Sequence, residues 1–135
     1  MNIVSKLVSF FNFGTLANST PLPVNWYSTF AEAKAAAAQT TNKLVLVKVH
    51  ADWCGYCKHF DQDIESTPFL SNYLSEHFVC ARVKEGTGEG KKLKKAHKVA
   101  AYPAFLVFRG ETFVGKVRGY ANAPALVDAL KTLLK

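Results

Sequence analysis

A chain of 135 residues is about the size of one domain and is long enough to bury a hydrophobic core without disulfide staples. Hydrophobic residues make up 49% and charged residues 20%, a balance that excludes a disordered or collagen-like chain. The net charge of +7 favours acidic partners, but it does not by itself indicate a specific nucleic-acid-binding protein. No stretch approaches the roughly 18 apolar residues that a membrane-spanning helix needs, so we expect no membrane span.

The N-terminal segment, residues 1–23, allows two interpretations. Lys6 precedes a short apolar run at 7–13, and Thr15-Leu16-Ala17 offers a small residue at which a signal peptidase could cut. The apolar side chains also recur at helical spacing, which predicts an amphipathic helix packed on the domain, and the prolines near residue 23 predict a linker. A signal peptide at 1–17 would direct the protein to a bacterial periplasm or cell envelope, and without one we expect a cytoplasmic protein.

From residue 24 onward, helical and strand patterns alternate. A capping residue, Ser28, with Glu32 near the third helical position predicts a helix that runs through the alanine-rich stretch to about residue 39. The β-branched, almost continuously apolar run at 44–49 is typical of a strand buried on both faces. Further periodic segments predict, in chain order, helices at 57–65 and 70–76, a strand at 78–83, a helix at 91–97, a hairpin of strands at 104–108 and 112–117, and a helix at 125–134. This order indicates the α/β class, with a central mixed β-sheet flanked by helices.

Two cysteines, Cys54 and Cys57, follow the 44–49 strand and open the next predicted helix. At a helix N-terminus, free backbone N–H groups and the helix dipole stabilise a thiolate, which is the nucleophile of thiol–disulfide exchange. We therefore expect Cys54 to be the exposed attacking thiol and Cys57 to be the resolving thiol. The alternative is half of a tetrahedral zinc site, but the sequence supplies no second half, so we expect no metal. Cys80 stands alone in an apolar strand and is expected to be a buried, inert thiol.

Two motifs of the chain resemble those of the thioredoxin superfamily. The segment 51–58, Ala-Asp-Trp-Cys-Gly-Tyr-Cys-Lys, is similar to the family's active-site signature. The segment 99–104, Val-Ala-Ala-Tyr-Pro-Ala, is similar to the one that ends in the family's cis-proline, and Gly119 matches a glycine at the edge of its final strand. The resemblance covers residues 24–135 and implies a thioredoxin-like domain with the thioredoxin fold.

The resemblance implies a thiol–disulfide oxidoreductase that exchanges dithiol and disulfide with protein substrates. Tyr102 and Pro103 would lie across from Cys54, with the Tyr102 backbone pairing with an extended substrate as an added strand. The other expected contacts to substrate lie around the cysteine motif and at the last strand edge: Trp53, Gly55, Tyr56 and Gly119.

A further resemblance concerns one group within the family. Trp26, the alanine-rich helix and the 43–47 run look most like the C-terminal domain of the transmembrane thiol:disulfide interchange reductases. We expect a monomeric reductase that receives electrons from an upstream reductase and needs no cofactor beyond the cysteine pair. The residues between the cysteines, Gly55 and Tyr56, bias the redox balance and leave oxidant and reductant open. A disulfide isomerase stays open, because Gly-Tyr between the cysteines also occurs in isomerases of the family. A peptide-binding or chaperone-like module that keeps the fold without catalysis stays open as well.

Lys48 departs from the family pattern, in which a buried acid stands six residues before the nucleophile. We hypothesise that the charge of Lys48 lowers the pKa of the thiol pair, or that Lys48 pairs with Glu85 on the neighbouring strand. The alternative is a lysine whose head reaches the edge of the sheet. The lysine-rich segment 91–98 is typical of a solvated helix face, with a dedicated anion site as the alternative.

Overall fold

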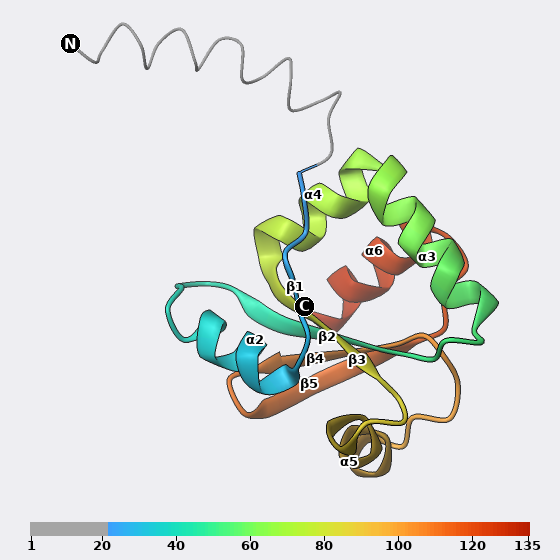
Figure 1. Ribbon diagram of the computed structural model, residues 1–135. Helices are drawn as coiled ribbons and strands as arrows, with labels where there is room; N and C mark the ends of the chain where they lie inside the picture. The colour runs from blue at the N-terminus through green and yellow to red at the C-terminus, as the bar shows by residue number, and fades with distance from the viewer. Residues whose placement is uncertain (1–21) are drawn as a thin grey trace, which may run out of the picture.

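The computed structural model describes residues 22–135, which form five strands and five helices (Figure 1). In chain order these are β1 (Trp26–Tyr27), α2 (Phe30–Ala37), β2 (Leu44–His50), α3 (Gly55–Ser66), α4 (Pro68–His77), β3 (Phe78–Lys84), α5 (Gly88–His97), β4 (Ala104–Arg109), β5 (Thr112–Arg118) and α6 (Ala123–Leu133). The expectations for a signal-like segment or helix before residue 22 lie outside the described residues. Within residues 22–135, no helix is long and apolar enough to cross a membrane.

The five strands make one mixed sheet in the order β1-β3-β2-β4-β5. β3 runs parallel to both β1 and β2, whereas β4 is antiparallel to both β2 and β5. Helices cover both faces of the sheet, as Figure 1 shows, with α3, α4 and α6 on one face and α2 and α5 on the other. The structure thus confirms the α/β class and the mixed sheet, and it places β2 in the centre of that sheet.

The two faces of β2 belong to two different cores, because side chains alternate along a strand. Val45, Val47 and Val49 pack on the side of α2 and α5, whereas Leu46 packs on the side of α3, α4 and α6. All four side chains are fully buried, and burying each contributes about 1.5–3 kcal/mol. By the same alternation Lys48 shares the face of Leu46, so its side chain extends toward α3.

The start of α2 is fixed by a capping box, one residue later than expected. Thr29, not Ser28, is the N-cap: its hydroxyl accepts a hydrogen bond from the Glu32 amide at 3.0 Å, and the Glu32 carboxylate accepts one from the Thr29 amide at 3.2 Å. The reciprocal pair needs a cap three residues before the glutamate, and only Thr29 has that spacing. A second contribution comes from Glu89 of α5, whose carboxylate accepts hydrogen bonds from the first two amides of α2 at 2.7 and 3.1 Å.

Helix α5 begins three residues before the expected helix. Thr87 is its N-cap and accepts a hydrogen bond from the Gly90 amide at 3.0 Å, which extends the helix into a glycine-rich stretch that carries no apolar periodicity. Gly90 lies so close to β3 that an added Cβ would collide with the carbonyl oxygen of Lys84. Strand β1 was not predicted at all, because two residues show no alternation. The other elements lie where their patterns predict them, within about three residues at each end.

Candidate functional site

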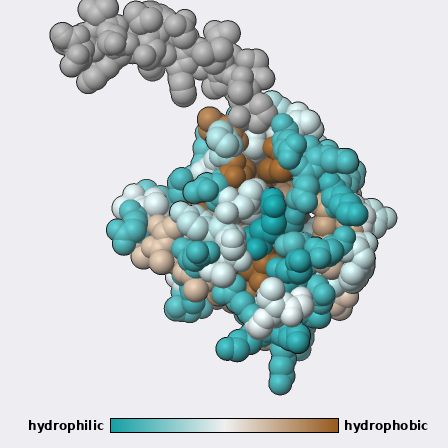
Figure 2. All heavy atoms as spheres, viewed as in Figure 1, coloured by the Kyte–Doolittle hydropathy of each residue, from teal (hydrophilic) through white to brown (hydrophobic). Residues whose placement is uncertain are grey.

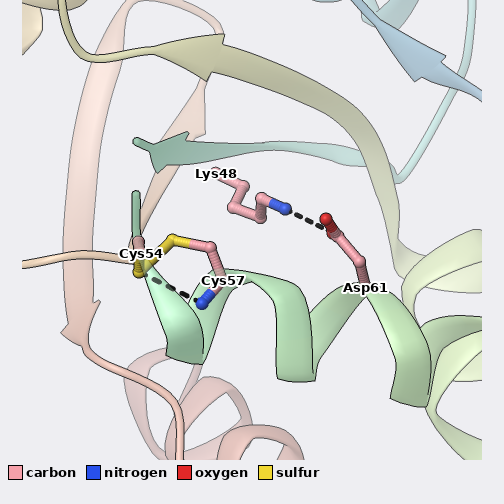
Figure 3. Close-up of a disulfide and its surroundings, with 4 residues drawn as sticks. All are labelled: Lys48, Cys54, Cys57 and Asp61. Atoms are coloured by element: carbon pink, nitrogen blue, oxygen red, sulfur yellow. Dashed lines mark hydrogen bonds and ion pairs between the residues drawn. A yellow bond between two sulfur atoms is a disulfide. The ribbon is translucent and has the colours of Figure 1, made fainter. Parts of the chain in front are cut away.

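The two cysteines lie where β2 has ended and α3 begins (Figure 3). Cys54 is the N-cap of α3, and its Sγ accepts a hydrogen bond from the Cys57 amide at 3.1 Å. The Cα atoms of Cys54 and Cys57 are 5.3 Å apart, and the two sulfurs are joined as a disulfide. The Cys54 sulfur therefore lies where a free helix N–H and the positive end of the helix dipole favour a thiolate once the bridge is reduced.

Cys54 is not the exposed residue that the sequence predicted. In the bridged form only 4% of Cys54 and 3% of Cys57 is accessible. Both residues cluster with Ala51, and the half-buried ring of Tyr102 packs against them. Exposure therefore does not distinguish the two cysteines, whereas the N-cap position, which only Cys54 occupies, does.

Tyr102 and Pro103 bring a second segment of chain to the cysteines. Their peptide bond is cis, as the resemblance predicts. The Pro103 carbonyl accepts a hydrogen bond from the Gly119 amide at 2.7 Å. Gly119 has a φ of +72°, a left-handed conformation that glycine adopts without the steric cost of a side chain. Gly119 thus connects the end of β5 to the Tyr102–Pro103 turn, and its amide N–H, which donates to Pro103, is not free to bind a substrate.

Exposed side chains surround the cysteines on the outside. Trp53 is 73% exposed and Tyr56 is 65% exposed. The Trp53 ring meets Tyr102 edge to face, with 5.6 Å between ring centres. Gly55 is also exposed and has open space around it. The residues expected to contact substrate around the motif thus share one exposed rim that offers aromatic surface to another chain.

Lys48 is 0% exposed, and its ammonium is paired with Asp61 of α3 (Figure 3). Nζ donates a hydrogen bond to Asp61 Oδ1 at 2.6 Å. Two expectations are therefore wrong. The side chain does not reach the sheet edge, because β2 is a central strand. Glu85 is not the partner, because the register sets Lys48 beside Arg82, three residues before Glu85, and Glu85 pairs instead with Lys94 of α5 at 3.3 Å.

The ion pair joins a buried cation to a partly solvated anion. Burial lowers the pKa of Lys48 because desolvation disfavours the ammonium, while the hydrogen bond and the charge of Asp61 act in the opposite direction. Asp61 keeps 43% of its side chain exposed. The ring centres of Phe60 and Trp26 lie 4.9 and 5.8 Å from Nζ and add cation–π attraction. Any influence of the Lys48 charge on the cysteines is thus opposed by a nearby negative charge.

Asp61 is the charged neighbour that sequence reasoning missed. It stands four residues after Cys57 on α3, and residues four apart share one face of a helix. Figure 3 shows both side chains on the side of α3 that faces the sheet. The helical spacing was the available signal for a carboxylate on the cysteine face of α3.

Comparison with known proteins identifies the family. A family model described as thioredoxin-like matches residues 25–110. The chain belongs to this family. Among solved structures, a putative disulphide-isomerase from Bacteroides thetaiotaomicron superposes with a TM-score of 0.74 at 28% identity, covering 87% of this chain and 96% of that one. A thioredoxin from Thermus thermophilus superposes with a TM-score of 0.69 at 26% identity, covering 83% and 88%. The fold is the thioredoxin fold.

The curated relatives of this thioredoxin-like chain include thiol:disulfide interchange proteins and protein disulfide-isomerases. It is 27% identical over 123 residues to the thiol:disulfide interchange protein DsbD of Tatumella citrea, covering 88% of this chain and 21% of that protein. It is 28% identical over 88 residues to a protein disulfide-isomerase of Hordeum vulgare, covering 64% and 17%. The chain therefore spans about a fifth of the length of these relatives. It is a thioredoxin-superfamily protein related to thiol:disulfide interchange proteins.

Two ion pairs lie beside the site of this thioredoxin-like protein. Lys84 pairs with Asp52 at 2.9 Å, and this contact lowers the pKa of Asp52. Lys94 lies with its Nζ 5.8 Å from the centre of the Tyr102 ring and 3.3 Å from Glu85. Its interactions with Tyr102 and, next, with Glu85 raise the pKa of Lys94, so its ammonium stays charged beside the aromatic rim.

Cys80 lies apart from the site, in β3. It is 2% exposed, and burial raises the pKa of its thiol to about 12, which keeps the thiol neutral. In the part of the chain that the structure describes, no group of three or more His, Cys, Asp or Glu side chains is placed to hold a metal ion.

Proposed function

We propose that this protein is a protein-disulfide reductase that works through Cys54 and Cys57. The observation that carries the proposal is the disulfide at the N-terminus of α3, packed against Tyr102 of the Tyr102–Pro103 turn. Membership of the thioredoxin-like family and the similarity to DsbD proteins support it. The reaction needs no cofactor beyond the cysteine pair.

The reductive reaction takes two exchange steps. The Cys54 thiolate attacks one sulfur of a substrate disulfide, a Cys54–substrate bond forms, and the departing substrate sulfur takes up a proton. The Cys57 thiol then gives up its proton and attacks the Cys54 sulfur. This second step releases the other substrate thiol and leaves the Cys54–Cys57 disulfide. Two electrons pass to the substrate, and an upstream dithiol reductase restores the pair by the same exchange.

The rim residues are proposed to hold the substrate. The exposed rings of Trp53 and Tyr56 supply apolar contact area, and the Tyr102 backbone offers hydrogen bonds to an extended chain. Pro103 shapes this segment. Gly119 acts through Pro103, since its amide is bonded to the Pro103 carbonyl, and we therefore assign it a positioning role.

Lys48 is proposed to tune the thiol pair through its charge. A nearby cation favours a thiolate, and Asp61 opposes that effect, so the two residues should act in opposite directions. Lys48→Met should lower the thiolate fraction of the reduced protein at a given pH, and Asp61→Asn should raise it. Ultraviolet titration of the thiolate measures both. Titration curves that coincide with the wild type in both variants would remove Lys48 from the mechanism.

A disulfide isomerase is the second candidate, because relatives and a structural neighbour carry that name. An isomerase also attacks through Cys54 but returns the substrate re-paired, without net transfer of electrons. A peptide-binding or chaperone-like module is a further alternative, in which Cys54→Ser would leave partner binding and the associated phenotype intact.

Insulin disulfide reduction and the reduction potential against glutathione test the proposal. A reductase should lose turnover in Cys54→Ser, keep it in Cys80→Ala, and have a potential more negative than about −220 mV. A potential near −120 mV, the range of strong oxidants, would overturn the reductive direction. Refolding of a protein with scrambled disulfides, retained in Cys57→Ser and without a net change in thiol content, would favour the isomerase.

A further inference from the structure

Helix α5 carries a stripe of lysines, one of which lies beside the redox site. Lys91, Lys94 and Lys95 stand at positions i, i+3 and i+4, so they share one side of the helix. Lys94 shows where this side points, because its Nζ lies 5.8 Å from the centre of the Tyr102 ring. Lys94 therefore adjoins the rim of the cysteine site, and Lys91 and Lys95 extend the positive charge from it along α5; these three residues are called the lysine stripe.

The outer lysines of the stripe are not neutralised by the rest of residues 22–135. Lys91 and Lys95 are exposed, and no described carboxylate lies within ion-pair distance of either. Glu89, the acidic residue in the first turn of α5, instead caps α2. Lys34 and Lys84, by contrast, each pair with a carboxylate, at 3.0 and 2.9 Å. The lower end of the molecule, where Figure 1 places α5, is largely hydrophilic in Figure 2.

We propose that the lysine stripe binds an acidic segment of the substrate protein, next to the disulfide that Cys54 attacks. The inference rests on the proposed function and specifies its substrate class. A chain held along Tyr102 would pass Lys94, and carboxylates on that chain could then pair with Lys91 and Lys95, which have no ion-pair partner within residues 22–135. The net charge of +7 adds long-range attraction for the same substrates.

The expected preference for an acidic substrate is modest because the lysines are solvated. Exposed ion pairs are weak, and two of them together correspond to about a three- to tenfold preference for an acidic substrate. The preference should fall with salt, because exposed charges are screened beyond about 3 Å at 1 M ionic strength.

Lys92 provides a matched control. It is exposed like Lys91 and Lys95, but it stands two residues before Lys94 and so points away from the side on which Lys94 meets Tyr102, and it lines a hollow with Phe30 and Ala96. Lys92→Gln therefore removes the same charge from the same helix without altering the stripe. Lysine and glutamine have similar helix propensities, so the substitutions should preserve α5.

The test uses two disulfide-bridged peptides that differ only in three Glu or three Gln residues beside the bridge. The rate constant for their reaction with the reduced protein is followed by tryptophan fluorescence. The wild type and Lys92→Gln should react about three- to tenfold faster with the Glu peptide at low salt. The double variant Lys91→Gln/Lys95→Gln should react equally with both peptides. Equal rates with the two peptides in the wild type, or an equal loss of the preference for the Glu peptide in Lys92→Gln, would overturn the inference.

Serine analogues of the two peptides, which cannot exchange, separate this inference from the proposed function. Calorimetry should show tighter binding of the Glu analogue to the wild type and no preference in Lys91→Gln/Lys95→Gln. Selective binding without exchange would overturn the reductase and leave the acidic-segment site standing. Exchange without selectivity in either assay would overturn the site and leave the reductase.

Discussion

Replacing Asp61 with Ala should destabilise the protein by about 2 kcal/mol, because it leaves a buried ammonium without its acceptor. Lys48 is 0% exposed, and Asp61 Oδ1 is its hydrogen-bond acceptor at 2.6 Å. A hydrogen bond to a charged group contributes about 1.5–3 kcal/mol. Lys48 can give up its proton when Asp61 is gone, and this reduces the loss of stability. The expected loss of about 2 kcal/mol therefore lies in the lower half of that range.

Replacing Lys48 with Met should change stability by less than about 1 kcal/mol, with either sign. The Asp61 carboxylate that remains keeps 43% of its side chain in solvent, so it is not left buried and unpaired. Methionine is unbranched and adapts its shape to a core, and removing the lysine also removes its desolvation cost. One ion pair thus gives two very different responses, because only one partner is buried.

Urea unfolding of the reduced proteins at neutral pH measures both effects. Asp128→Ala is the control for replacing a helical aspartate, since Asp128 is exposed on α6 and should change stability by less than about 0.5 kcal/mol. If Lys48→Met were as damaging as Asp61→Ala, the ion pair would be a net stabiliser and the desolvation argument would be wrong.

The pH dependence of stability tests the Lys48–Asp61 ion pair in a second way. The folded-state pKa of Lys48 is lowered from 10.5, so between the two values the unfolded chain binds more protons and the contribution of Lys48 to stability rises with pH. Asp61→Ala removes the hydrogen bond and the negative charge that raise this pKa. The rise that Lys48 contributes should therefore span a wider pH range in Asp61→Ala than in the wild type, and it should be absent in Lys48→Met.

Three further predictions concern the scaffold. Burial raises the pKa of Cys80 to about 12 in the folded protein, so above the ordinary thiol pKa the unfolded chain loses this proton first and Cys80 lowers the stability. The wild type should therefore lose about 1.4 kcal/mol more stability between pH 8 and pH 10 than Cys80→Ala does, as urea unfolding at both pH values would measure. Gly90→Ala should cost about 1–3 kcal/mol of stability because its Cβ would strike the β3 backbone. Gly88→Ala, where the Cβ would meet open space, should be neutral or slightly stabilising. Equal thermal midpoints for the two variants would contradict this packing. Tyr120→Phe should cost about 1.5–3 kcal/mol, since the Tyr120 hydroxyl donates to Asp63 at 2.6 Å, and an unchanged urea midpoint would show that this hydrogen bond contributes nothing net.

Much of the fold was predictable because its strands are buried on both faces. The 44–49 run had to be a central strand, since continuous apolar and β-branched residues suit no surface element, and the structure places β2 in the centre of the sheet. The amphipathic last helix and the final hairpin followed from periodicity in the same way. The cis bond before Pro103 came from the resemblance, and no pattern in the chain itself indicates it.

The parts that could not be predicted depend on contacts between distant segments. The partner of Lys48 is decided by strand register and by the face of α3, so a guess based on the neighbouring strand chose Glu85 instead of Asp61. The low exposure of Cys54 results from the packing of Tyr102, which lies far away in the sequence. The contact of Lys94 with Tyr102 likewise depends on how α5 packs beside the Tyr102–Pro103 turn, which the lysine pattern does not indicate.

Trapping a mixed disulfide tests the central claim most directly. Cys57→Ser removes the resolving thiol, so the reduced variant should form a stable covalent adduct with a disulfide-containing protein such as insulin. Peptide mapping by mass spectrometry should locate the adduct at Cys54, and dithiothreitol should release it. An adduct that persists in Cys54→Ser/Cys57→Ser, and so maps to Cys80, would contradict the account, as would the absence of any adduct in Cys57→Ser.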